Sequence, residues 1–565
     1  MADFIGKTNE YPTQFRDIIR VSASLYADKP AILVKKEETY RAYTYRRLRS
    51  DIEAFGTALV AKGFLGKKIL ILGDNGYEWA LALLTALSGA FAAVPLDKTL
   101  SATDVAQLCQ YTEAAAIFYS DRYPDSVSAL PEGVTALPFS SFGELLEEGR
   151  RLQESGNDAF TAATPDENAL ALLLFSPGLS AAPRDVMLSG KNLCFTVSRA
   201  ASALGVGKDD SFLSLLPLHH AYELVCDLLV PLSVGASVAF GEGLHAIMKN
   251  MNEIHPTVLV TAPVIAEAIW RKVQKMLSSG FSKLADTEIA ASNLLPQRMS
   301  MPLKKRLFAN IHRAFGGSLR MIVCGGAPVG AHIMKGLRDV GFLATEGYGP
   351  YECGTVVTLN PRNAARYGSV GKPLDDLILD IYNKGEDGTG EIRVKSEGVM
   401  LGYYKNEGAT EEAIRGGWLY TGDLGYIDQS GYLFVTGRKK NLLVRATGRS
   451  VFPEELEALL MKEQFVKETI VVGFINEKKR DYDLVAVVYP DKERLADLYG
   501  ENYTVRDEET EIENAVEKVN ASLPDYKRID MFVLRDTEFE KNASRKIRRA
   551  GVAASVTEEY FRKRS

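Results

Sequence analysis

Short apolar strands alternate with segments of helical periodicity over about the first 430 of the 565 residues. Four of the apolar stretches are residues 68–73, 115–119, 257–261 and 321–325, and residues 264–277 show helical spacing of their apolar side chains. This alternation is typical of βαβ units with parallel sheets. Because one hydrophobic core rarely serves more than about 250–300 residues, we expect an α/β fold with more than one domain. Ligands of such folds bind beyond the carboxyl ends of the strands, where glycine-rich turns cluster.

The character of the sequence changes near residue 368. Strand-like segments become dense over residues 368–436 and are separated by short glycine-containing turns, which predicts a β-rich subdomain. The polar stretch 437–441 is a candidate linker, and residues 442–565 combine strands, an amphipathic helix and many charges. We therefore expect a large N-terminal domain over residues 1–436, built mainly from stacked βαβ-type sheets, and a small α+β C-terminal domain over residues 442–565.

Charge and cysteine content exclude several classes of protein. The formal net charge is −6, which gives no electrostatic footprint for general nucleic-acid binding. The five cysteines are far apart and include no CxxC pair, so we expect neither a disulfide framework nor a zinc cluster, and we expect a reducing, cytoplasmic location.

Neither a signal peptide nor a transmembrane segment is expected. Residues 1–11 carry charges and lack the apolar run of a secretory signal. Residues 79–96 are uncharged and approach the length of a membrane span, but Gly89 interrupts them. We expect a buried helix over 79–88 followed by a strand over 90–94.

The familiar phosphate-binding motifs are absent, because the chain has neither a GxxxxGK[ST] loop nor a GxGxxG fingerprint. Instead, ten short motifs follow one another along nearly the whole chain: GDNGYEW (73–79), GAFAAVPL (89–96), LLPLHHAYE (215–223), GGAP (325–328), GYGPYEC (347–353), GSVGKP (368–373), VMLGYYK (399–405), WLYTGD (418–423), GRKK (437–440) and SRKIR (544–548). Their identity and order resemble the adenylate-forming, AMP-binding superfamily, and the pattern is most similar to that of fatty acyl-CoA synthetases.

The resemblance implies a two-step reaction. A carboxylate attacks the α-phosphate of Mg-ATP to give an acyl-adenylate and pyrophosphate, and a thiol then displaces AMP. It implies ATP, Mg²⁺ and CoA as cofactors and a small carboxylic acid, with a bias toward fatty acids, as substrate. An acyl carrier protein in place of CoA, and peripheral contact with a membrane, are left open; nucleic acid is not expected as a partner.

The resemblance also assigns roles to residues near the middle of the chain. Glu352 matches the glutamate that helps hold Mg²⁺, as a hard cation prefers carboxylate oxygen. Tyr348 matches the aromatic residue that stacks on adenine, and Gly349 follows it in the same turn. Tyr351 stands where the family usually has a phosphate-contacting threonine, so a bulky ring would crowd or cap that position differently. The structural alternatives are a solvated turn carboxylate for Glu352 and ordinary core packing for Tyr348.

Two other groups of residues complete the ligand-binding assignments. Asp423 matches the ribose-binding aspartate, and Arg438 matches the arginine that meets ribose and phosphate; a surface ion pair is the alternative for both. The turn Gly326, Ala327 and Pro328 matches a nucleotide-binding segment of the family.

The acyl side of the site is assigned to three further residues. Gly325 is expected at the substrate, and His219 and His220 lie in the loop that normally borders the carboxylate pocket. A polar loop pair without a ligand is an equally good interpretation of the two histidines. A metal role is not expected, because adjacent residues rarely chelate one ion.

The C-terminal region supplies the residues expected to move. Lys440 lies at the position of the family's hinge, about which the C-terminal domain rotates between the two steps. Lys546 matches the lysine of this mobile domain whose ammonium bridges the carboxylate and the α-phosphate, although Arg545 replaces the usual preceding glycine. Gly448 matches a turn glycine past which the pantetheine arm of CoA runs. With Glu352 and Arg438, Lys546 forms the expected catalytic set.

The phosphate loop departs from the family pattern. It follows the expected strand 169–175 and retains Ser176, Gly178, Ser180 and Arg184 as candidate phosphate ligands. However, Pro177 lacks an amide donor, Leu179 lacks a hydroxyl, and Ala181 and Asp185 replace glycines. Three functions therefore stay open: an active ligase, an enzyme with impaired adenylation that uses preformed acyl-adenylate or an acyl carrier protein, and a non-catalytic AMP- or acyl-binding protein.

Overall fold

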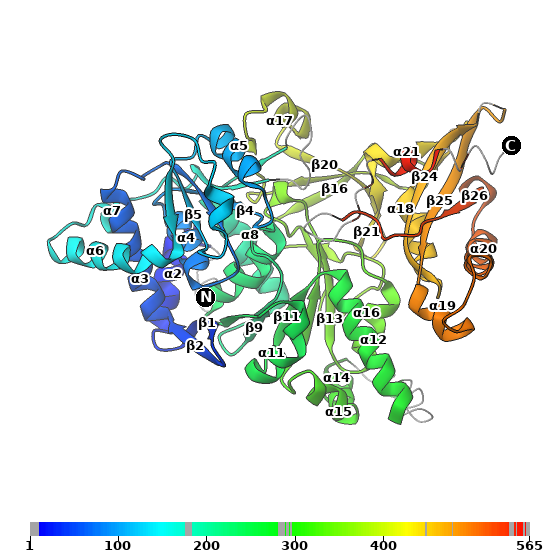
Figure 1. Cartoon of the computed structure of the whole chain (residues 1–565), viewed down its shortest axis with the longest axis horizontal. Helices are drawn as coiled ribbons and strands as arrows, with labels where there is room; N and C mark the ends of the chain where they lie inside the picture. The colour runs from blue at the N-terminus through cyan, green and yellow to red at the C-terminus, as the bar shows by residue number, and fades with distance from the viewer. Residues whose placement is uncertain are drawn as a thin grey trace. The chain divides into compact units, whose positions relative to one another are not determined.

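The structure is a computed structural model that describes residues 11–175, 184–280, 289, 293, 297–446, 449–476, 478–541, 547, 549, 551–557 and 560 (Figure 1). The chain divides into two compact units. The first comprises Met1–Leu379 and Val394–Leu419, and the second comprises Asp380–Arg393 and Tyr420–Ser565. The fold is the mixed α/β arrangement expected from the alternating strands and helices.

A seven-stranded sheet forms one layer of the first unit. Its centre is parallel: β3 (Lys68–Leu72) lies between β4 and β5, and β6 and β7 flank these two. Two antiparallel strands, β8 and then β18, continue the sheet beyond β7. The bounds of these strands are β4 (Ala92–Leu96), β5 (Ala116–Tyr119), β6 (Thr135–Pro138), β7 (Leu170–Leu174), β8 (Val186–Ser189) and β18 (Gly402–Tyr403).

A nine-stranded sheet in the order β15-β14-β13-β12-β11-β9-β10-β1-β2 carries the turns that matter for function. Its strands from β1 to β13 along this order pair in parallel, and β2, β14 and β15 pair antiparallel at the two edges. The strands are β1 (Pro30–Lys36), β2 (Thr39–Thr44), β9 (Ser211–Ser214), β10 (Ser237–Phe240), β11 (Val258–Thr261), β12 (Met321–Cys324), β13 (Leu343–Tyr348), β14 (Thr358–Leu359) and β15 (Lys372–Pro373).

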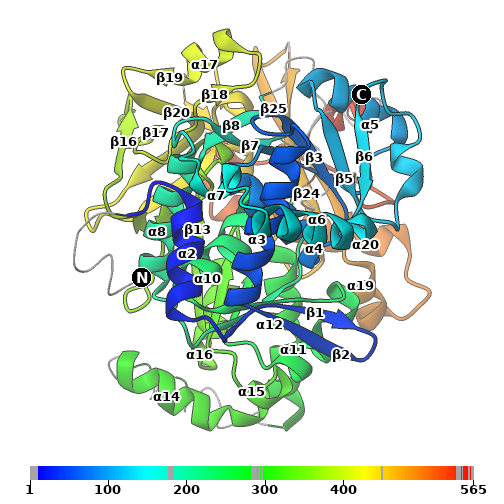
Figure 2. The same cartoon turned by 90° about the vertical axis from the view of Figure 1, so that its left-hand side faces the viewer.

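Helices pack on both sheets. In Figure 2, α2 and α3 lie side by side, with α6 and α7 next to α3. The described helices of the first unit are α2 (Phe15–Leu25), α3 (Tyr45–Ala61), α4 (Tyr77–Leu87), α5 (Ala102–Thr112), α6 (Phe142–Glu154), α7 (Ala159–Ala162), α8 (Gly190–Leu204), α9 (Ala221–Glu223), α10 (Val230–Val234), α11 (Ile247–Ile254), α12 (Pro263–Gly280), α14 (Gln297–Leu307), α15 (Ala309–Ala314), α16 (Ala331–Asp339) and α17 (Glu407–Ala413). A π-helical segment, Leu224–Leu229, joins α9 to α10.

A smaller sheet has the order β16-β17-β20-β19, with β21 paired to β20. The boundary between the two units falls within this sheet, since Leu379 and Leu419 end segments of the first unit. Its strands are β16 (Ile378–Tyr382), β17 (Gly390–Lys395), β19 (Ile414–Arg415), β20 (Trp418–Ile427) and β21 (Leu433–Arg438). Strands therefore dominate residues 368–436, where the turn-rich sequence predicted them.

The rest of the second unit is built on a three-stranded sheet, β24-β25-β26. One face packs against α18 and α20 through buried aliphatic residues such as Leu456 and Ile512. The elements are the hairpin β22 (Leu443–Val444) and β23 (Ser450–Val451), and then α18 (Pro453–Leu460), β24 (Val466–Asn476), β25 (Asp481–Pro490), α19 (Lys492–Tyr499), α20 (Val505–Ala521), β26 (Met531–Leu534) and α21 (Val552–Ser555). The predicted domain limits and the hinge stay predictions.

The uncharged stretch 79–96 forms a helix, α4, and a buried strand, β4, as predicted. Gly89 between them has φ +95°, in the left-handed region that glycine adopts without strain. Throughout the described ranges, none of the helices combines the length and the apolar character that crossing a bilayer requires.

Candidate active site

Two glycine-rich turns follow neighbouring parallel strands of the nine-stranded sheet. Cys324 at the end of β12 pairs in register with Glu346 of β13, so the turns after these strands begin at the same edge. Gly325 is buried, and a Cβ there would lie 2.6 Å from the ring of Tyr222, so any side chain would displace the ring. Gly326 has φ +79°. The turn 325–328 therefore needs both glycines, one for space and one for conformation.

The second turn runs from Tyr348 to Thr355. A Cβ on Gly349 would lie 2.5 Å from the carbonyl oxygen of Thr355, so only glycine permits this close approach. The backbone N–H groups of Cys353 and Thr355 both donate to the carbonyl oxygen of Pro350, at 3.1 Å. Tyr348 is half-buried at the end of β13. The sheet edge thus brings the predicted residues Tyr348, Gly349 and Glu352 next to the turn 325–328.

Glu352 is oriented by a tyrosine from a distant part of the sequence. The hydroxyl of Tyr403 donates to Oε1 of Glu352 at 2.7 Å, and the Met400 N–H donates to the Glu352 carbonyl oxygen at 2.8 Å. Burial and the neighbouring Glu352 carboxylate raise the pKa of Tyr403, so the phenol stays protonated and remains a donor. The result is a partly exposed carboxylate held by a neutral partner, which fits a ligand for a hard cation such as Mg²⁺.

Tyr403 lies close to Arg184, the last of the candidate phosphate ligands. The Cζ atom of Arg184 lies 5.7 Å from the centre of the Tyr403 ring, and its Nη2 is 3.4 Å from Oε2 of the exposed Glu412. Ser176, Gly178 and Ser180, the other three candidate phosphate ligands, lie outside the described residues.

Asp185, directly after Arg184, is buried. It is 3% exposed, and its side chain is hydrogen-bonded to Tyr111, whose pKa burial and this carboxylate raise. Its carbonyl oxygen accepts from the Tyr404 N–H at 2.8 Å. The carboxylate that replaces the family's glycine is therefore taken up by an internal contact with Tyr111.

Tyr351 connects this turn to the histidine loop. The backbone of Ala221 is hydrogen-bonded to its phenol, and burial and the nearby Glu223 raise the phenol pKa. The bulky side chain at this position thus caps the start of α9, directly after His219 and His220.

The two histidines lie against each other, with His220 buried and His219 partly buried. Their ring centres lie 4.2 Å apart with the ring planes tilted by 49°, and Nε2 of His219 lies 3.8 Å from Oδ2 of Asp97. Burial, and then the adjacent His220, lower the pKa of His219 to about 3, so its imidazole is neutral at pH 7. Within the ranges the structure covers, no cluster of three or more potential metal ligands is found.

In the second unit, Asp423 and Arg438 face each other on β20 and β21. They are register partners, and Nε of Arg438 lies 2.6 Å from Oδ1 of Asp423. The aspartate side chain is 5% exposed and the arginine side chain is 50% exposed, so the carboxylate is the buried member. Lys440 is exposed in the short turn directly after β21. Gly448 and Lys546 lie outside the described residues.

Glu346 is a buried carboxyl group next to the glycine-rich turns that the sequence patterns did not single out. It is 6% exposed on β13, directly before the glycine-rich turn, and the backbone N–H of Val329 is hydrogen-bonded to its carboxyl group. Burial raises its pKa to about 8, so it is largely a neutral acid at pH 7. Tyr403 and Tyr222 were also missed as individual residues. The signal for Glu346 was an acidic residue inside an otherwise apolar strand.

Comparison with known families shows to which family the chain belongs. Residues 19–404 match the model of the AMP-binding enzyme family, and residues 440–559 match the model of the AMP-binding enzyme C-terminal domain. The first match alone covers more than half of the chain, so the protein belongs to the AMP-binding enzyme family.

Individual relatives are similar along most of their length. The long-chain-fatty-acid–CoA ligase FadD15 of Mycobacterium bovis is 28% identical over 450 residues, which cover 75% of this chain and 74% of the relative. The long-chain-fatty-acid–CoA ligase 1 of Cavia porcellus is 28% identical over 507 residues, which cover 82% of this chain and 71% of the relative.

Solved structures agree with the fold at lower sequence identity. The anthranilate CoA ligase AuaEII, in complex with anthranoyl-AMP, superposes with a TM-score of 0.76 at 19% identity over 98% of both chains. The o-succinylbenzoate CoA synthetase of Bacillus subtilis, in complex with AMP, superposes with a TM-score of 0.72 at 21% identity over 95% of this chain and 97% of that chain.

Proposed function

We propose that this protein is an ATP-dependent acid–thiol ligase that activates a carboxylic acid as an acyl-adenylate and transfers the acyl group to the thiol of CoA. The observation that carries the proposal is the paired turns after β12 and β13, which bring Gly325–Pro328, Tyr348 and Glu352 to one sheet edge in a member of the AMP-binding family. Relatives named as CoA ligases support the thiol as acceptor.

The candidate site residues that the structure describes each have a role in this chemistry. Tyr348 offers an aromatic face for adenine, and Tyr403 fixes the carboxylate of Glu352 so that it can hold Mg²⁺. Mg²⁺ held by Glu352 would supply positive charge that offsets the negative charge of the phosphates. Asp423 accepts hydrogen bonds from the ribose hydroxyls, and Arg438 balances its charge.

The C-terminal residues complete the proposal. Lys546 places a positive charge between the attacking carboxylate and the α-phosphate, where negative charge develops. Lys440 is the hinge, and Gly448 lets the pantetheine arm of CoA pass close to the backbone. Ser176, Gly178, Ser180 and Arg184 bind the β- and γ-phosphates.

A fatty acid is the proposed substrate class. Two relatives named as long-chain-fatty-acid–CoA ligases support it, as does the apolar surrounding of the loop that carries His219 and His220. Because the pKa of His219 is lowered to about 3, its imidazole adds no charge beside an acyl chain.

The observation on Asp185 favours an active ligase over a protein with impaired adenylation. A carboxylate exposed in the phosphate loop would repel ATP, but Asp185 is 3% exposed and bonded to Tyr111. The other departures from the family pattern are Pro177, Leu179 and Ala181. They remove hydrogen-bond donors and backbone freedom but add no negative charge.

The test is release of pyrophosphate by the full-length protein with Mg-ATP, CoA and saturated fatty acids of graded length, together with short and aromatic acids. Acyl-CoA is identified by mass spectrometry, and an arm with a pantetheinylated acyl carrier protein in place of CoA identifies the acceptor. We expect pyrophosphate and acyl-CoA with at least one fatty acid. Measurable AMP binding without pyrophosphate release across the panel would replace the ligase by a nucleotide-binding protein.

A further inference from the structure

The turn after β3 belongs to the motif 73–79, to which the proposed reaction assigns no role. Two of its side chains have contacts that serve packing. Asp74 forms an ion pair with Lys98, and the hydroxyl of Tyr77 donates to Oδ2 of Asp51 at 2.9 Å. Both contacts stay among the seven-stranded sheet, its turns and the helices packed on it.

Asn75 differs from these residues, because its side chain reaches a loop of the nine-stranded sheet. Its Oδ1 accepts from the Leu218 N–H at 3.1 Å, and its Nδ2 donates to the Leu216 carbonyl oxygen at 2.8 Å. Nδ2 also lies 3.5 Å from Oγ of Ser214, the last residue of β9. One planar amide thus binds backbone groups on both sides of Pro217, which itself has no N–H to donate.

The residues that Asn75 binds lead directly into the loop of the two histidines. Leu218 precedes His219, and the His220 N–H donates to the Pro217 carbonyl oxygen at 3.2 Å. Oδ2 of Asp97, in the turn after β4, lies 3.8 Å from Nε2 of His219. The turns after two neighbouring strands of the seven-stranded sheet, β3 and β4, therefore both meet this loop.

The other end of the loop is held by the glycine-rich turn 348–355. The backbone of Ala221 is hydrogen-bonded to the phenol of Tyr351, which directly precedes Glu352 in that turn. The loop 216–221 is therefore fixed at its start by the seven-stranded sheet and at its end by the turn that carries the proposed Mg²⁺ ligand. Release of either end would change how the histidines lie relative to Glu352.

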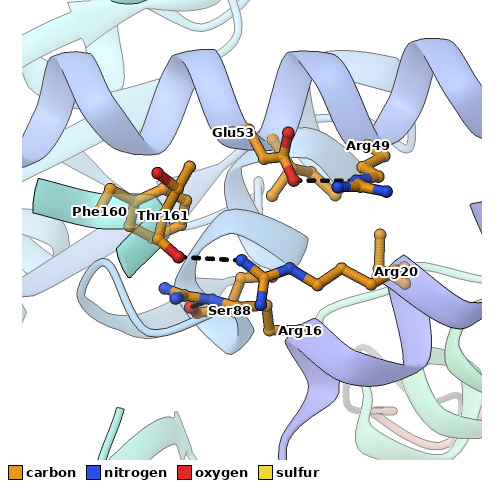
Figure 3. Close-up of a pocket in the computed structure, with 9 residues that line it drawn as sticks. Arg16, Arg20, Arg49, Glu53, Ser88, Phe160 and Thr161 are labelled. Carbon is orange, nitrogen blue, oxygen red and sulfur yellow. Dashed lines mark hydrogen bonds and ion pairs between the residues drawn. The ribbon is translucent and has the colours of Figure 1, made fainter. Parts of the chain in front are cut away.

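Asn75 projects from a well-anchored part of the fold. Helix α4 begins two residues later, and Trp79 in its first turn is 1% exposed. At the other end of α4, Nε of Arg16 donates to the Ser88 carbonyl oxygen at 2.8 Å (Figure 3). Because asparagine is short and its helix is anchored, little side-chain freedom is left to be lost when it binds the loop.

We propose that Asn75 is a positioning residue for the acyl side of the reaction: its two bonds to the backbone of 216–218 keep the histidine loop where it borders the carboxylic acid. The inference rests on the proposed function, because it concerns the same site. In the described structure, the side-chain hydrogen bonds of Asn75 go to this loop and to the end of β9, and not to the turns 325–328 and 348–355. Its loss should therefore affect the carboxylic acid and spare the nucleotide.

The first test is steady-state kinetics of full-length Asn75→Ala with Mg-ATP, CoA and the fatty acid that the wild type uses best. We expect the KM for the acid to rise about fivefold to fiftyfold, because two hydrogen bonds that hold the loop are lost. The KM for ATP should stay within about twofold of the wild-type value. A smaller amount of folded protein would lower the rate at saturation and leave both KM values unchanged, so the two KM values separate positioning from folding.

Two further variants sharpen this test. Asn75→Asp keeps the size of the side chain and the acceptor for Leu218 but turns an oxygen toward the Leu216 carbonyl, so it should raise the KM for the acid in the same range. Asn520→Ala is the matched control, because Asn520 is also half-buried and its amide binds the Ile529 N–H at 2.8 Å and the Ile529 carbonyl oxygen at 2.9 Å, in the second unit. We expect Asn520→Ala to leave both KM values unchanged.

Hydrogen–deuterium exchange measures the loop without relying on turnover. The Leu218 N–H loses its acceptor in Asn75→Ala, so peptides that cover 216–221 should exchange about tenfold faster than in the wild type or in Asn520→Ala. If the wild type releases no pyrophosphate, the proposed function has failed, and the exchange rates alone then show whether Asn75 holds the loop.

A KM for the acid equal to that of the wild type in both Asn75 variants would overturn the proposal. An equal rise in the KM for ATP would also overturn it, because Asn75 would then support the whole site instead of its acyl side. Unchanged exchange over 216–221 in Asn75→Ala would do the same. Circular dichroism checks that each variant is folded, and if Asn75→Ala does not fold, Asn75→Asp supplies the kinetic result.

Discussion

Glu352 in the first unit and Asp423 in the second are the two carboxylates on which the proposed site most depends, and different donors hold them. Glu352 accepts from the neutral phenol of Tyr403 at 2.7 Å, while Asp423 meets the guanidinium of Arg438 at 2.6 Å. A phenol orients a carboxylate and leaves its charge intact, whereas a guanidinium cancels it. Glu352 is therefore suited to attract a cation, and Asp423 is suited to accept hydrogen bonds from uncharged hydroxyl groups.

The largest effect on the rate should follow from removing the charge of Glu352, which is held by a neutral phenol. We expect Glu352→Gln to reduce pyrophosphate release by about 100-fold or more, because the amide keeps the shape and loses the attraction for Mg²⁺. The measurement is the rate at saturating ATP, with Glu386→Gln as control, since Glu386 is exposed in a turn. A rate close to that of the wild type would mean that the metal is held by other residues.

A smaller effect is expected at Asp423, whose charge is neutralised by Arg438. Asp423→Asn should weaken AMP binding about tenfold, because the ribose loses a charged acceptor and Arg438 loses its partner. Calorimetry with AMP measures this change, and the Mg²⁺ requirement should not move. If Asp423→Asn instead changed the Mg²⁺ requirement, the contrast between the two carboxylates would be wrong.

The role of the phenol can be separated from that of the carboxylate. Tyr403→Phe should raise the Mg²⁺ concentration needed for half-maximal rate by about threefold to tenfold, because Glu352 loses the donor that orients it. Tyr404→Phe is the matched control: Tyr404 is a neighbouring buried tyrosine whose hydroxyl donates to the Thr112 carbonyl oxygen at 3.3 Å. An equal shift in both variants would point to a general packing defect.

Glu346 is a third carboxyl group to compare, and in the described structure no cation lies close enough to form a salt bridge with it. We expect it to affect the pH dependence of the free energy of unfolding. Its pKa is raised to about 8 in the folded protein, above the ordinary value of 4.5. Between these values the folded state holds a proton that the unfolded chain has lost, so stability falls as pH rises, by up to about 1.4 kcal/mol per pH unit.

Glu346→Gln removes this dependence. Urea unfolding between pH 5.5 and 8.5 should give a flatter stability profile for the variant than for the wild type, with no further difference in slope above about pH 9. Parallel profiles would show that Glu346 is ionised, by contact with a cation or with water.

Much of the fold followed from local sequence. The stretches 68–73 and 321–325 form β3 and β12 because apolar runs bounded by glycine suit buried parallel strands. The helix and strand within 79–96 were also predicted, since Gly89 fixes the break between them. Such features depend on neighbours in the sequence, which is where pattern reasoning is strongest.

The parts that were missed depend on contacts between distant residues. Tyr403 lies 51 residues from Glu352, so no spacing rule links them. Asp185 reads as a loop charge in the sequence, and only its contact with Tyr111 reveals that it is buried. Arg16 donates to a carbonyl oxygen 72 residues away and to another 147 residues away, and no local pattern in the sequence links these residues.

The contact between Tyr222 and Gly325 has a consequence for evolution. The Tyr222 ring occupies the space of a side chain at position 325, and its hydroxyl donates to the Val323 carbonyl oxygen at 3.1 Å. A larger residue at position 325 fits only after residue 222 has been replaced by a smaller one. A protein with large residues at both positions would have a steric clash between them. Positions 222 and 325 should therefore change together among descendants of a common ancestor, and the order of the two substitutions should be fixed.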